Sequence, residues 1–262
     1  YTLAQIAEIV GGELQGDGTT TIGQLYTDTR KIQTAEYSLF FAINTEKNNG
    51  HLYLEAAYAK GISAAIISTA TNHNGAYILV NDTLRALQTL CGHHRQQYEI
   101  PLLAITGSNG KTIVKEWISQ LLTGTFAVCK NPKSYNSQIG VPLSVWQLSQ
   151  EHEVGIFEAG ISQPGEMKKL AAVLQPTIGI FTHLGDAHGR QFASDEQKLE
   201  EKLLLFESCD TIICNTAQPL VLAAIKKLGK KTFTWGNLIS ADLHVTQSTA
   251  GSYLATYLGV SE

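Results

Sequence analysis

The feature that most constrains the fold of this chain is a short glycine-rich stretch between an apolar run and a helical pattern. It consists of Thr106, Gly107, Ser108, Asn109, Gly110, Lys111 and Thr112. The apolar residues 102–105 before it are typical of a buried strand, and residues 114–122 after it have the pattern of a helix. The N–H groups of such a turn and of the first helical turn can together surround phosphate oxygens. The stretch therefore predicts a phosphate-binding loop (P-loop) inside an α/β fold.

Two side chains of this loop are expected to take part in binding. Lys111 would contact the β- and γ-phosphates of a nucleotide, and the hydroxyl of Thr112 would bind Mg²⁺. Ile105 departs from the general pattern, which has glycine at that position. The alternative is an ordinary glycine-rich turn with an exposed lysine. We favour the phosphate loop because Gly-Lys-Thr falls where the strand passes into the helix.

The chain after residue 100 alternates between strand and helix patterns, which indicates a mainly parallel sheet with helices on both faces. The expected strands lie at 101–106, 125–129, 153–159, 177–183 and 210–215. The earlier residues begin with a capping box at Thr2 and Gln5 and continue with shorter strand patterns. We therefore expect an α/β protein with a small N-terminal α/β domain at 1–98 and a P-loop mononucleotide-binding domain at 99–262.

Composition argues against several classes of function. The formal net charge is −4, so there is no basic excess of the kind that binds nucleic acid. No apolar run approaches the roughly 20 residues that a membrane helix needs, and no signal peptide is evident. The four cysteines form no C-x-x-C pair, which favours free thiols in a reducing compartment. We expect a cytoplasmic protein with no nucleic-acid or membrane partner.

Polar residues follow three of the expected strands. Glu158 ends the strand at 153–159, His183 and His188 follow the next strand, and Asn215 ends the last. Ligands of an open parallel sheet lie outside the carboxyl ends of its strands, so these side chains would gather near the loop if the strand order permits. Glu158 is the natural Mg²⁺ ligand, and a solvent-exposed carboxylate is the alternative. A loop histidine taken alone is more often a surface residue.

Lys202 occupies an unusual position on an expected helix. It lies at the margin of the apolar stripe formed by Leu199, Leu203 and Phe206. A lysine whose stem covers the core while its head stays in water is the simpler interpretation, and helix geometry alone favours it. The alternative is a lysine partly removed from water, with a lowered pKa and an amine that can be chemically modified.

These segments, in this order and along essentially the whole chain, resemble the Mur ligase family. The loop at 106–112 is similar to the shortened phosphate loop of that family, which does not need glycine at the position of Ile105. The other matching segments are 28–30, 131–143, 158–160, 165–167 and 182–188, followed by Lys202 at the family's spacing from His188.

The resemblance implies functions for residues whose role the sequence pattern alone left open, and for Lys202 it favours the modified lysine over the exposed one. Glu158 and His188 match residues that help to hold two Mg²⁺ ions. Lys202 matches a lysine that carries a carbamate, formed from CO₂, which helps to place the second ion. Asn215 matches a position near the adenine of ATP. With Lys111 on the phosphates, the catalytic residues implied are Lys111, Lys202 and His188.

The resemblance also implies a substrate site. Asp28, Thr29 and Arg30 match the place where the first domain of the family meets the uridine nucleotide of the substrate. Asn136 and Ser137 match a segment near its muramyl part. The sequence departs from the family's usual pattern at some positions, with His183 in place of asparagine, Ile113 in place of threonine, Ser137-Gln138 in place of Asn-Glu, and Asn49 in place of aspartate.

The implied activity is ATP-dependent amide formation in peptidoglycan precursor synthesis. The carboxylate of UDP-N-acetylmuramoyl-tripeptide would be activated as an acyl phosphate, and the amine of D-Ala-D-Ala would then displace phosphate. The alternatives are the sister ligase that adds the third amino acid of the peptide, a folate polyglutamate ligase and a non-catalytic nucleotide-binding module. A third domain that binds the amine substrate is expected in such a ligase and lies outside residues 1–262, so we expect this chain alone to be inactive.

Overall fold

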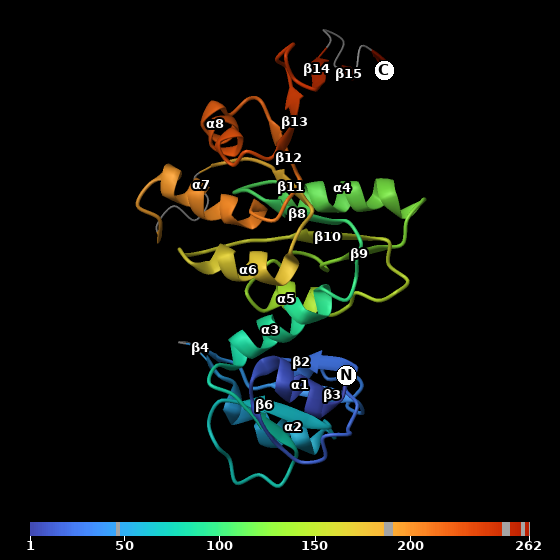
Figure 1. Ribbon diagram of the computed structural model, residues 1–262, viewed down its shortest axis with the longest axis vertical. Helices are drawn as coiled ribbons and strands as arrows, with labels where there is room; N and C mark the ends of the chain where they lie inside the picture. The colour runs from blue at the N-terminus through green and yellow to red at the C-terminus, as the bar shows by residue number, and fades with distance from the viewer. Residues whose placement is uncertain (46–47, 186–190, 248–251, 258–259, 262) are drawn as a thin grey trace. The chain divides into compact units, whose positions relative to one another are not determined.

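The computed structural model describes residues 1–262 except 46–47, 186–190, 248–251, 258–259 and 262 (Figure 1). The chain forms two compact units, Tyr1–Gln97 and Tyr98–Glu262, and each unit has a sheet of its own. Both sheets are mostly parallel and carry helices, which confirms the predicted α/β fold class.

The first unit is built on a five-stranded sheet in the order β1-β7-β6-β3-β2. Its strands run parallel except β1, which pairs antiparallel with β7 at one edge. The strands are β1 (Glu13–Gln15), β2 (Gln24–Tyr26), β3 (Ser38–Phe41), β6 (Ala64–Ile67) and β7 (Tyr77–Leu79), with a separate ribbon of β4 (Asn44–Thr45) and β5 (Asn48–Asn49). The helices are α1 (Leu3–Val10), α2 (Leu54–Ala59) and α3 (Thr83–Arg95), with 3₁₀ turns η1 (Thr29–Lys31) and η2 (Gly50–Tyr53).

The first helix begins at the capping box that the sequence predicts. The Gln5 N–H donates to the Thr2 hydroxyl (3.3 Å), and the Thr2 N–H donates to the Gln5 side chain (2.9 Å). Gly11 ends the helix with a φ of 63°, a conformation that favours glycine. Strands β3 and β6 are buried at every residue. Residues of α2 pack on one side of the sheet, and α3 contacts the same two strands, so their apolar runs are continuous rather than alternating.

The second unit contains a nine-stranded sheet in the order β16-β15-β14-β13-β12-β11-β8-β10-β9. Strands β8 to β14 run parallel, and β15 and β16 continue the sheet antiparallel at one edge. The strands are β8 (Leu102–Thr106), β9 (Val128–Lys130), β10 (Val154–Glu158), β11 (Ile178–Phe181), β12 (Thr211–Asn215), β13 (Lys231–Gly236), β14 (Leu243–Gln247), β15 (Tyr253–Tyr257) and β16 (Val260–Ser261). The helices are α4 (Lys111–Thr123), α5 (Gly140–Val145), α6 (Glu166–Leu174), α7 (Asp195–Leu203) and α8 (Pro219–Lys227), with the 3₁₀ turn η4 (Leu204–Phe206).

Helices cover both faces of the central strands of this sheet. On one face, apolar residues of α4 such as Ile118 pack against Ile105 and Ile156. On the other, η4 contacts β8, β11 and α6, and the ring of Phe206 lies directly against Gly179. A Cβ atom at Gly179 would lie 2.5 Å from that ring, so the strand needs glycine there. The central strands are therefore packed on both faces.

The five strands predicted in this unit are all present, with ends shifted by a few residues. The edge formed by β13 to β16 was not predicted. Its strands are only partly buried where their side chains are described, so their sequences lack the apolar runs that identified the central strands.

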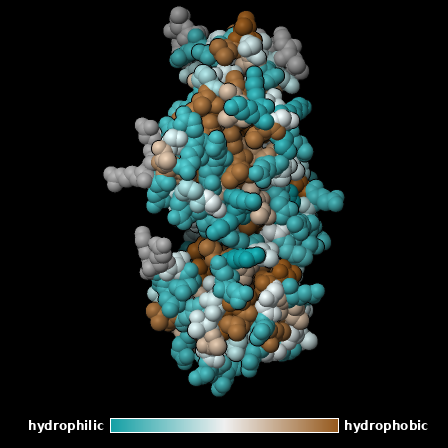
Figure 2. Space-filling view, turned by 60° about the vertical axis from the view of Figure 1, so that its left-hand side comes forward, coloured by the Kyte–Doolittle hydropathy of each residue, from teal (hydrophilic) through white to brown (hydrophobic). Residues whose placement is uncertain are grey.

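The surface in view is mixed in polarity, with hydrophobic residues scattered among hydrophilic ones (Figure 2). Within the described residues, no helix is both long and apolar enough to cross a membrane.

Candidate active site

The loop at 106–112 connects β8 to α4 and is fastened to the end of β11. The Ser108 N–H donates to the His183 carbonyl oxygen (2.6 Å), and the Thr182 hydroxyl donates to the Asn109 carbonyl oxygen (2.6 Å). Gly107 has a φ of 144°, and a Cβ atom there would lie 2.1 Å from the Thr182 hydroxyl oxygen. The loop therefore needs glycine at this close approach, and its backbone is held in place before any ligand binds.

The helix after this loop begins without a side-chain cap. Gly110 is its first flanking residue, with a φ of 83°, and no side-chain cap bonds the helix start within the described residues. The N–H groups of that turn remain available to an anion, and the helix dipole favours one. Thr112 lies in this turn and is partly exposed. The geometry is that of a phosphate-binding loop rather than of an ordinary turn.

Lys111 folds back over the loop instead of extending into solvent. Its ammonium donates to the carbonyl oxygens of Gly107 (2.9 Å) and Ser108 (3.2 Å). Burial lowers the pKa of Lys111, and the carboxylate of Glu158 partly opposes this. The Ser108 hydroxyl is buried and has no hydrogen-bond partner among the described residues. The ammonium of Lys111 and the Ser108 hydroxyl, which is unpaired among the described residues, thus lie at the loop to which a phosphate would bind.

Glu158 ends β10, and its Cα pairs with that of Ile105 on the neighbouring strand β8. The strand order thus places this residue beside the loop. Its side chain is fully buried (0% exposed), so the solvent-exposed alternative is wrong. The Asn136 amide donates to Oε1 (3.1 Å), while Oε2 has no hydrogen-bond partner among the described residues. A buried carboxylate oxygen without a partner is costly unless a cation or donor binds it.

Lys202 lies on α7 and is only 3% exposed, so the expectation of a head group in water is wrong. Its ammonium donates to the Gly107 carbonyl oxygen (3.2 Å). Burial, followed by the nearby charges of Lys111 and Lys198, lowers the pKa of Lys202 from 10.5 to about 7. A substantial fraction of this amine is therefore neutral near pH 7 and can act as a nucleophile.

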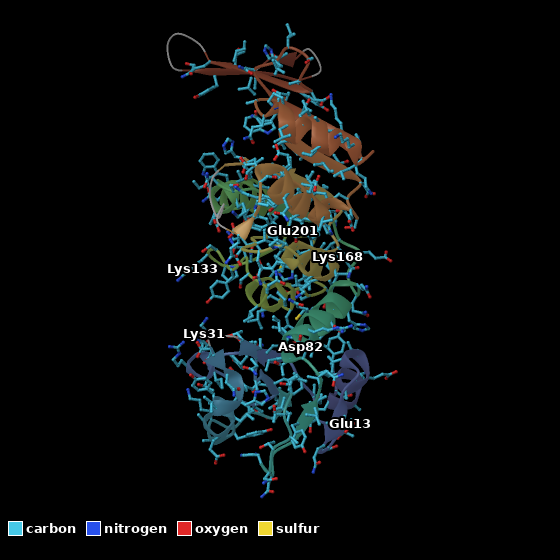
Figure 3. All side chains as sticks on the ribbon, turned by 90° about the vertical axis from the view of Figure 1, so that its left-hand side faces the viewer. Glu13, Lys31, Asp82, Lys133, Lys168 and Glu201 are labelled. Carbon is cyan, nitrogen blue, oxygen red and sulfur yellow. The ribbon has the colours of Figure 1, made fainter. Side chains whose placement is uncertain are left out.

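The same helix carries a second buried lysine that the sequence analysis did not single out. Lys198 is 1% exposed and donates to the Gly185 carbonyl oxygen and to Asp195 Oδ1 (3.3 Å). Helix α7 is joined to α6 by Glu201, which accepts from the Met167 N–H at 3.0 Å. Glu201 of α7 and Lys168 of α6 are labelled in Figure 3. Lys198 is one helical turn before Lys202 and so lies on the same side of the helix. Its position beside the apolar residues of α7 could therefore have identified it as a second lysine near the core.

The other residues predicted for this site lie in different surroundings. Asn215 ends β12, separated from β8 by β11, and its side-chain oxygen accepts from the Ala217 N–H (2.6 Å). His188 lies outside the described residues. His183 is exposed and contributes its carbonyl oxygen to the loop. Ser137 accepts from the Gly140 N–H (3.1 Å) at the start of α5.

Among the described residues, no three His, Cys, Asp or Glu side chains lie close enough together to hold a metal ion. An ion beside Glu158 would therefore need further oxygen ligands, such as phosphate oxygens and the Thr112 hydroxyl. The unpaired Oε2 atom is a suitable ligand for Mg²⁺, because hard cations prefer carboxylate oxygen. The residues present thus fit a magnesium–nucleotide complex.

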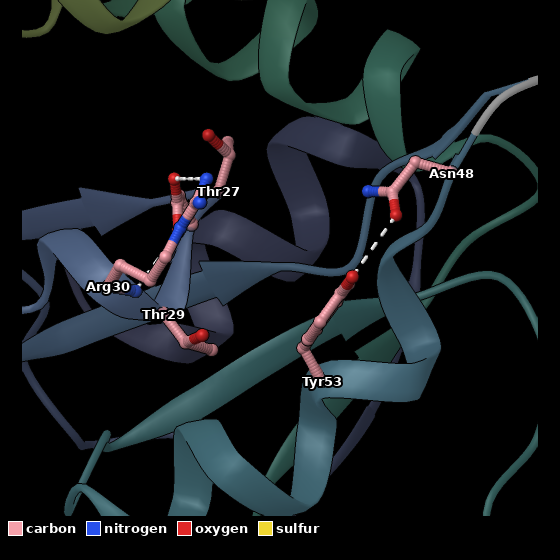
Figure 4. A pocket seen from close by; sticks show the side chains of 6 residues that line it. Thr27, Thr29, Arg30, Asn48 and Tyr53 are labelled. Atoms are coloured by element: carbon pink, nitrogen blue, oxygen red, sulfur yellow. Dashed lines mark hydrogen bonds and ion pairs between the residues drawn. The ribbon is translucent and has the colours of Figure 1, made fainter.

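The first unit contains a pocket of about 350 Å³ (Figure 4). Its lining residues are Thr27, Asp28, Thr29, Arg30, Asn48 and Tyr53. Asp28 accepts from the Arg30 guanidinium through both carboxylate oxygens (3.0 and 2.8 Å), and this hydrogen bonding lowers the pKa of Asp28. The Tyr53 hydroxyl donates to the Asn48 side chain (3.4 Å). The pocket offers an exposed guanidinium, amide and hydroxyl groups and one aromatic ring to a polar ligand.

In the second unit, a strand–loop–helix with an uncapped helix start and a fastened glycine-rich loop defines a P-loop nucleotide-binding domain. Residues 105–256 match the family described as Mur ligase middle domain. That is more than half of the chain, and the chain belongs to the Mur ligase family.

Particular relatives can be named. Over 260 residues the chain is 31% identical to the UDP-N-acetylmuramoyl-tripeptide–D-alanyl-D-alanine ligase of Bacillus subtilis (strain 168), an alignment that covers 96% of this chain and 56% of that protein. Over 193 residues it is 32% identical to the ligase of the same name from Escherichia coli (strain K12), covering 74% and 42%. The chain thus spans about half the length of the curated relatives it matches.

Solved structures share the fold. MurF from Acinetobacter baumannii superposes with a TM-score of 0.91 at 22% identity, covering 100% of this chain and 59% of that one. The MurF ligase of Thermotoga maritima in complex with ADP gives a TM-score of 0.80 at 22% identity, covering 93% and 57%.

Proposed function

We propose that this chain is the substrate- and nucleotide-binding part of an ATP-dependent ligase that joins D-Ala-D-Ala to UDP-N-acetylmuramoyl-tripeptide. The observation that carries the proposal is the buried Glu158, whose Oε2 atom has no hydrogen-bond partner among the described residues, beside a loop on which Lys111 and Lys202 both donate to one carbonyl oxygen. The name of the Bacillus subtilis relative, aligned over 96% of the chain, supports this particular pair of substrates.

The chain's own residues would position and neutralise the phosphates. The loop amides and the first turn of α4 would bind them, and the adenine would lie near Asn215. Lys111 would turn from the loop carbonyls to the γ-phosphate while the tripeptide carboxylate attacks it. Two Mg²⁺ ions would neutralise the negative charge that develops on the phosphates. Glu158, Thr112 and His188 would hold these ions, so ATP and Mg²⁺ are the proposed cofactors.

Lys202 is proposed to act as a carbamate. Its neutral amine would attack the carbon of CO₂, and loss of the amine proton would leave a carboxylate on Nζ. The lowered pKa makes this reaction accessible near neutral pH. The product would supply further oxygen ligands beside Glu158, where no three His, Cys, Asp or Glu side chains of the described residues lie close enough together to hold a metal ion.

The first unit is proposed to bind the UDP end of the substrate. Asp28, Thr29 and Arg30 line its pocket, with Arg30 held by Asp28 and available to a diphosphate. Asn136 and Ser137, in the second unit, would meet the muramyl part. The proposed substrates and the four buried free thiols are consistent with a cytoplasmic protein.

The alternatives are less well supported. The Bacillus subtilis and Escherichia coli relatives both carry the D-Ala-D-Ala name, which favours this activity over that of the sister ligase. A folate polyglutamate ligase would leave the polar pocket of the first unit without a role. A non-catalytic module would leave the buried Glu158 and Lys202 unexplained, because burying charges costs free energy.

The test is phosphate release from ATP by the intact protein with UDP-N-acetylmuramoyl-tripeptide, and with and without D-Ala-D-Ala. We expect release to require both substrates and to yield the pentapeptide product. Turnover of the UDP-linked dipeptide with a single amino acid, in place of this pair, would instead establish the sister activity.

A further inference from the structure

Lys115 is a fully buried lysine that the proposed reaction does not use. It lies one turn after Lys111 on α4 and is 0% exposed. Its ammonium donates to the carbonyl oxygens of Asn131 (2.7 Å) and Lys133, and it forms an ion pair with Glu116 (3.2 Å). A buried ammonium is unfavourable unless several acceptors surround it, so these contacts are specific.

The two carbonyl groups belong to the loop between β9 and α5. Lys133 has a φ of 49°, which is strained for a residue other than glycine. Tyr135 and Asn136 form the rest of a tight turn, in which their N–H groups donate to Pro132 (3.1 Å) and Ser134 (2.8 Å). The ammonium of Lys115 therefore holds a turn that contains a strained residue, Lys133.

This loop in turn holds Glu158. The Asn131 side chain accepts from the Glu158 N–H (3.1 Å) and donates to the Glu158 carbonyl oxygen (3.1 Å) and to that of Tyr135 (2.9 Å). Asn136 donates its amide to Oε1 of Glu158 (3.1 Å), and its carbonyl oxygen accepts from the Gly160 N–H (2.9 Å). A Cβ atom at Gly160 would lie 2.9 Å from the Asn136 side chain, so that side chain has little room to move.

We propose that Lys115 is a positioning residue: it fixes the loop at 131–136 so that Asn136 holds one oxygen of Glu158 and leaves the other, Oε2, free for a metal ion. The helix that bears Lys111 and Thr112 is thereby tied to the carboxylate on the neighbouring strand. The phosphate-binding and metal-binding groups then keep a fixed spacing. The inference rests on the proposed function of Glu158 as a Mg²⁺ ligand.

The test uses Lys115→Met in the intact protein, with Lys130→Met as the matched control. Lys130 shares the same partner, Glu116 (2.5 Å), but donates to no carbonyl group of this loop in the described structure. Two quantities are measured: hydrogen exchange of the amides of Tyr135 and Asn136, and Mn²⁺ affinity in the presence of ADP. Neither requires turnover.

For K115M we expect exchange at these amides to accelerate by roughly tenfold or more, and Mn²⁺ affinity to fall by about three- to tenfold. K130M should change neither. Unchanged exchange in K115M, or equal effects in K130M, would overturn the proposal. If K115M does not fold, Lys115→Gln, which keeps an N–H donor, replaces it, and failure of both variants to fold would assign Lys115 to overall stability instead.

Glu158→Gln separates this proposal from the proposed function. If E158Q binds Mn²⁺–ADP as tightly as the unmodified protein, the metal role of Glu158 is wrong. Loosening of the loop in K115M would then still establish its hold on the loop. If E158Q loses Mn²⁺ affinity and K115M does not, Glu158 remains a metal ligand and the proposal that Lys115 positions it is wrong.

Discussion

Lys111 and Lys202 donate to the same acceptor, the carbonyl oxygen of Gly107, at 2.9 and 3.2 Å. One lysine comes from the helix that follows the loop and the other from α7, far along the chain. Two ammonium groups around one carbonyl oxygen repel each other, and the charge of Lys111 favours the neutral form of Lys202. The arrangement is most favourable when anions, such as phosphates or a carbamate, enter between them.

Replacing Lys202 with alanine should lower ligase activity by at least about 100-fold, because the proposed carbamate can no longer form. Added acetate or formate should restore part of the activity by supplying the missing carboxylate. The control is Lys168→Ala, an exposed lysine on α6. Initial rates of phosphate release with and without the added anion measure the effect. A K202A variant of unchanged activity would contradict the carbamate mechanism.

The burial of Lys202 should also make the stability of the second unit depend on pH. The folded pKa of about 7 is below the ordinary 10.5, so between these values the unfolded chain holds more protons. The contribution of Lys202 to the free energy of unfolding therefore rises as pH increases from about 7 towards 10.5, and below about pH 7 the cost of the buried ammonium is present in full.

Lys202→Met should accordingly be more stable than the unmodified protein at pH 6, with a difference that shrinks by pH 9. Urea unfolding in CO₂-free buffer measures it, and all 3 tryptophans lie in the second unit, so their fluorescence reports this unit. A difference that is the same at both pH values would show that the pKa of Lys202 is not lowered.

Replacing Glu158 with glutamine preserves its shape and the acceptor for Asn136 while removing the charge. We expect a folded protein whose activity falls by at least about 100-fold and whose requirement for Mg²⁺ increases. Titration of activity with Mg²⁺ at fixed ATP measures both, with the exposed Glu151→Gln as the control. An E158Q variant with an unaltered Mg²⁺ titration would exclude Glu158 as a ligand.

Gly107→Ala should abolish detectable ADP binding and destabilise the second unit by about 1–3 kcal/mol, because its φ of 144° is strained for alanine and the methyl group would collide with Thr182. Gly124→Ala is the matched control, since a Cβ atom there meets nothing within 4 Å. Calorimetric titration with ADP and thermal unfolding distinguish the two. Equal behaviour of both variants would mean that the loop tolerates a side chain.

Asp28→Asn should release Arg30 from its paired geometry in the first unit. We expect KM for the UDP-linked substrate to rise by roughly tenfold, with kcat and KM for ATP little changed. Asp17→Asn is the control, because the Asp17 carboxylate accepts from Thr19 and Asp17 is not among the residues that line the pocket. A fall in kcat without a change in KM would argue against a binding role.

The phosphate loop was predictable because its signal is local. A strand, a glycine-rich turn and a helix adjacent in the chain must be adjacent in space, and the loop residues therefore lie where the sequence placed them. The capping box at Thr2 and Gln5 is equally local. Glu158 was identified from its position at a strand end, but its place beside the loop depended on β10 pairing with β8, which the sequence does not specify.

The burial of three lysines could not be predicted from local sequence patterns. Helical periodicity places Lys202, Lys198 and Lys115 near the apolar stripes of their helices. It does not predict which other segment of the chain packs over each lysine. Lys202 was expected to reach water, and its head group instead lies against Gly107. Whether a lysine at the margin of a stripe is exposed depends on which segment packs over it, and those segments are distant in the chain.

The sequence by itself determined the parallel α/β class and the loop at 106–112, because periodicity and turn chemistry act over a few residues. Only the tertiary structure decided that Glu158 is buried with one oxygen unpaired in the described part of the chain, that Lys111 and Lys202 share an acceptor and that Lys115 donates to the loop at 131–136. Strand order and packing set burial, and burial sets both the pKa of an amine and the number of partners a carboxylate finds.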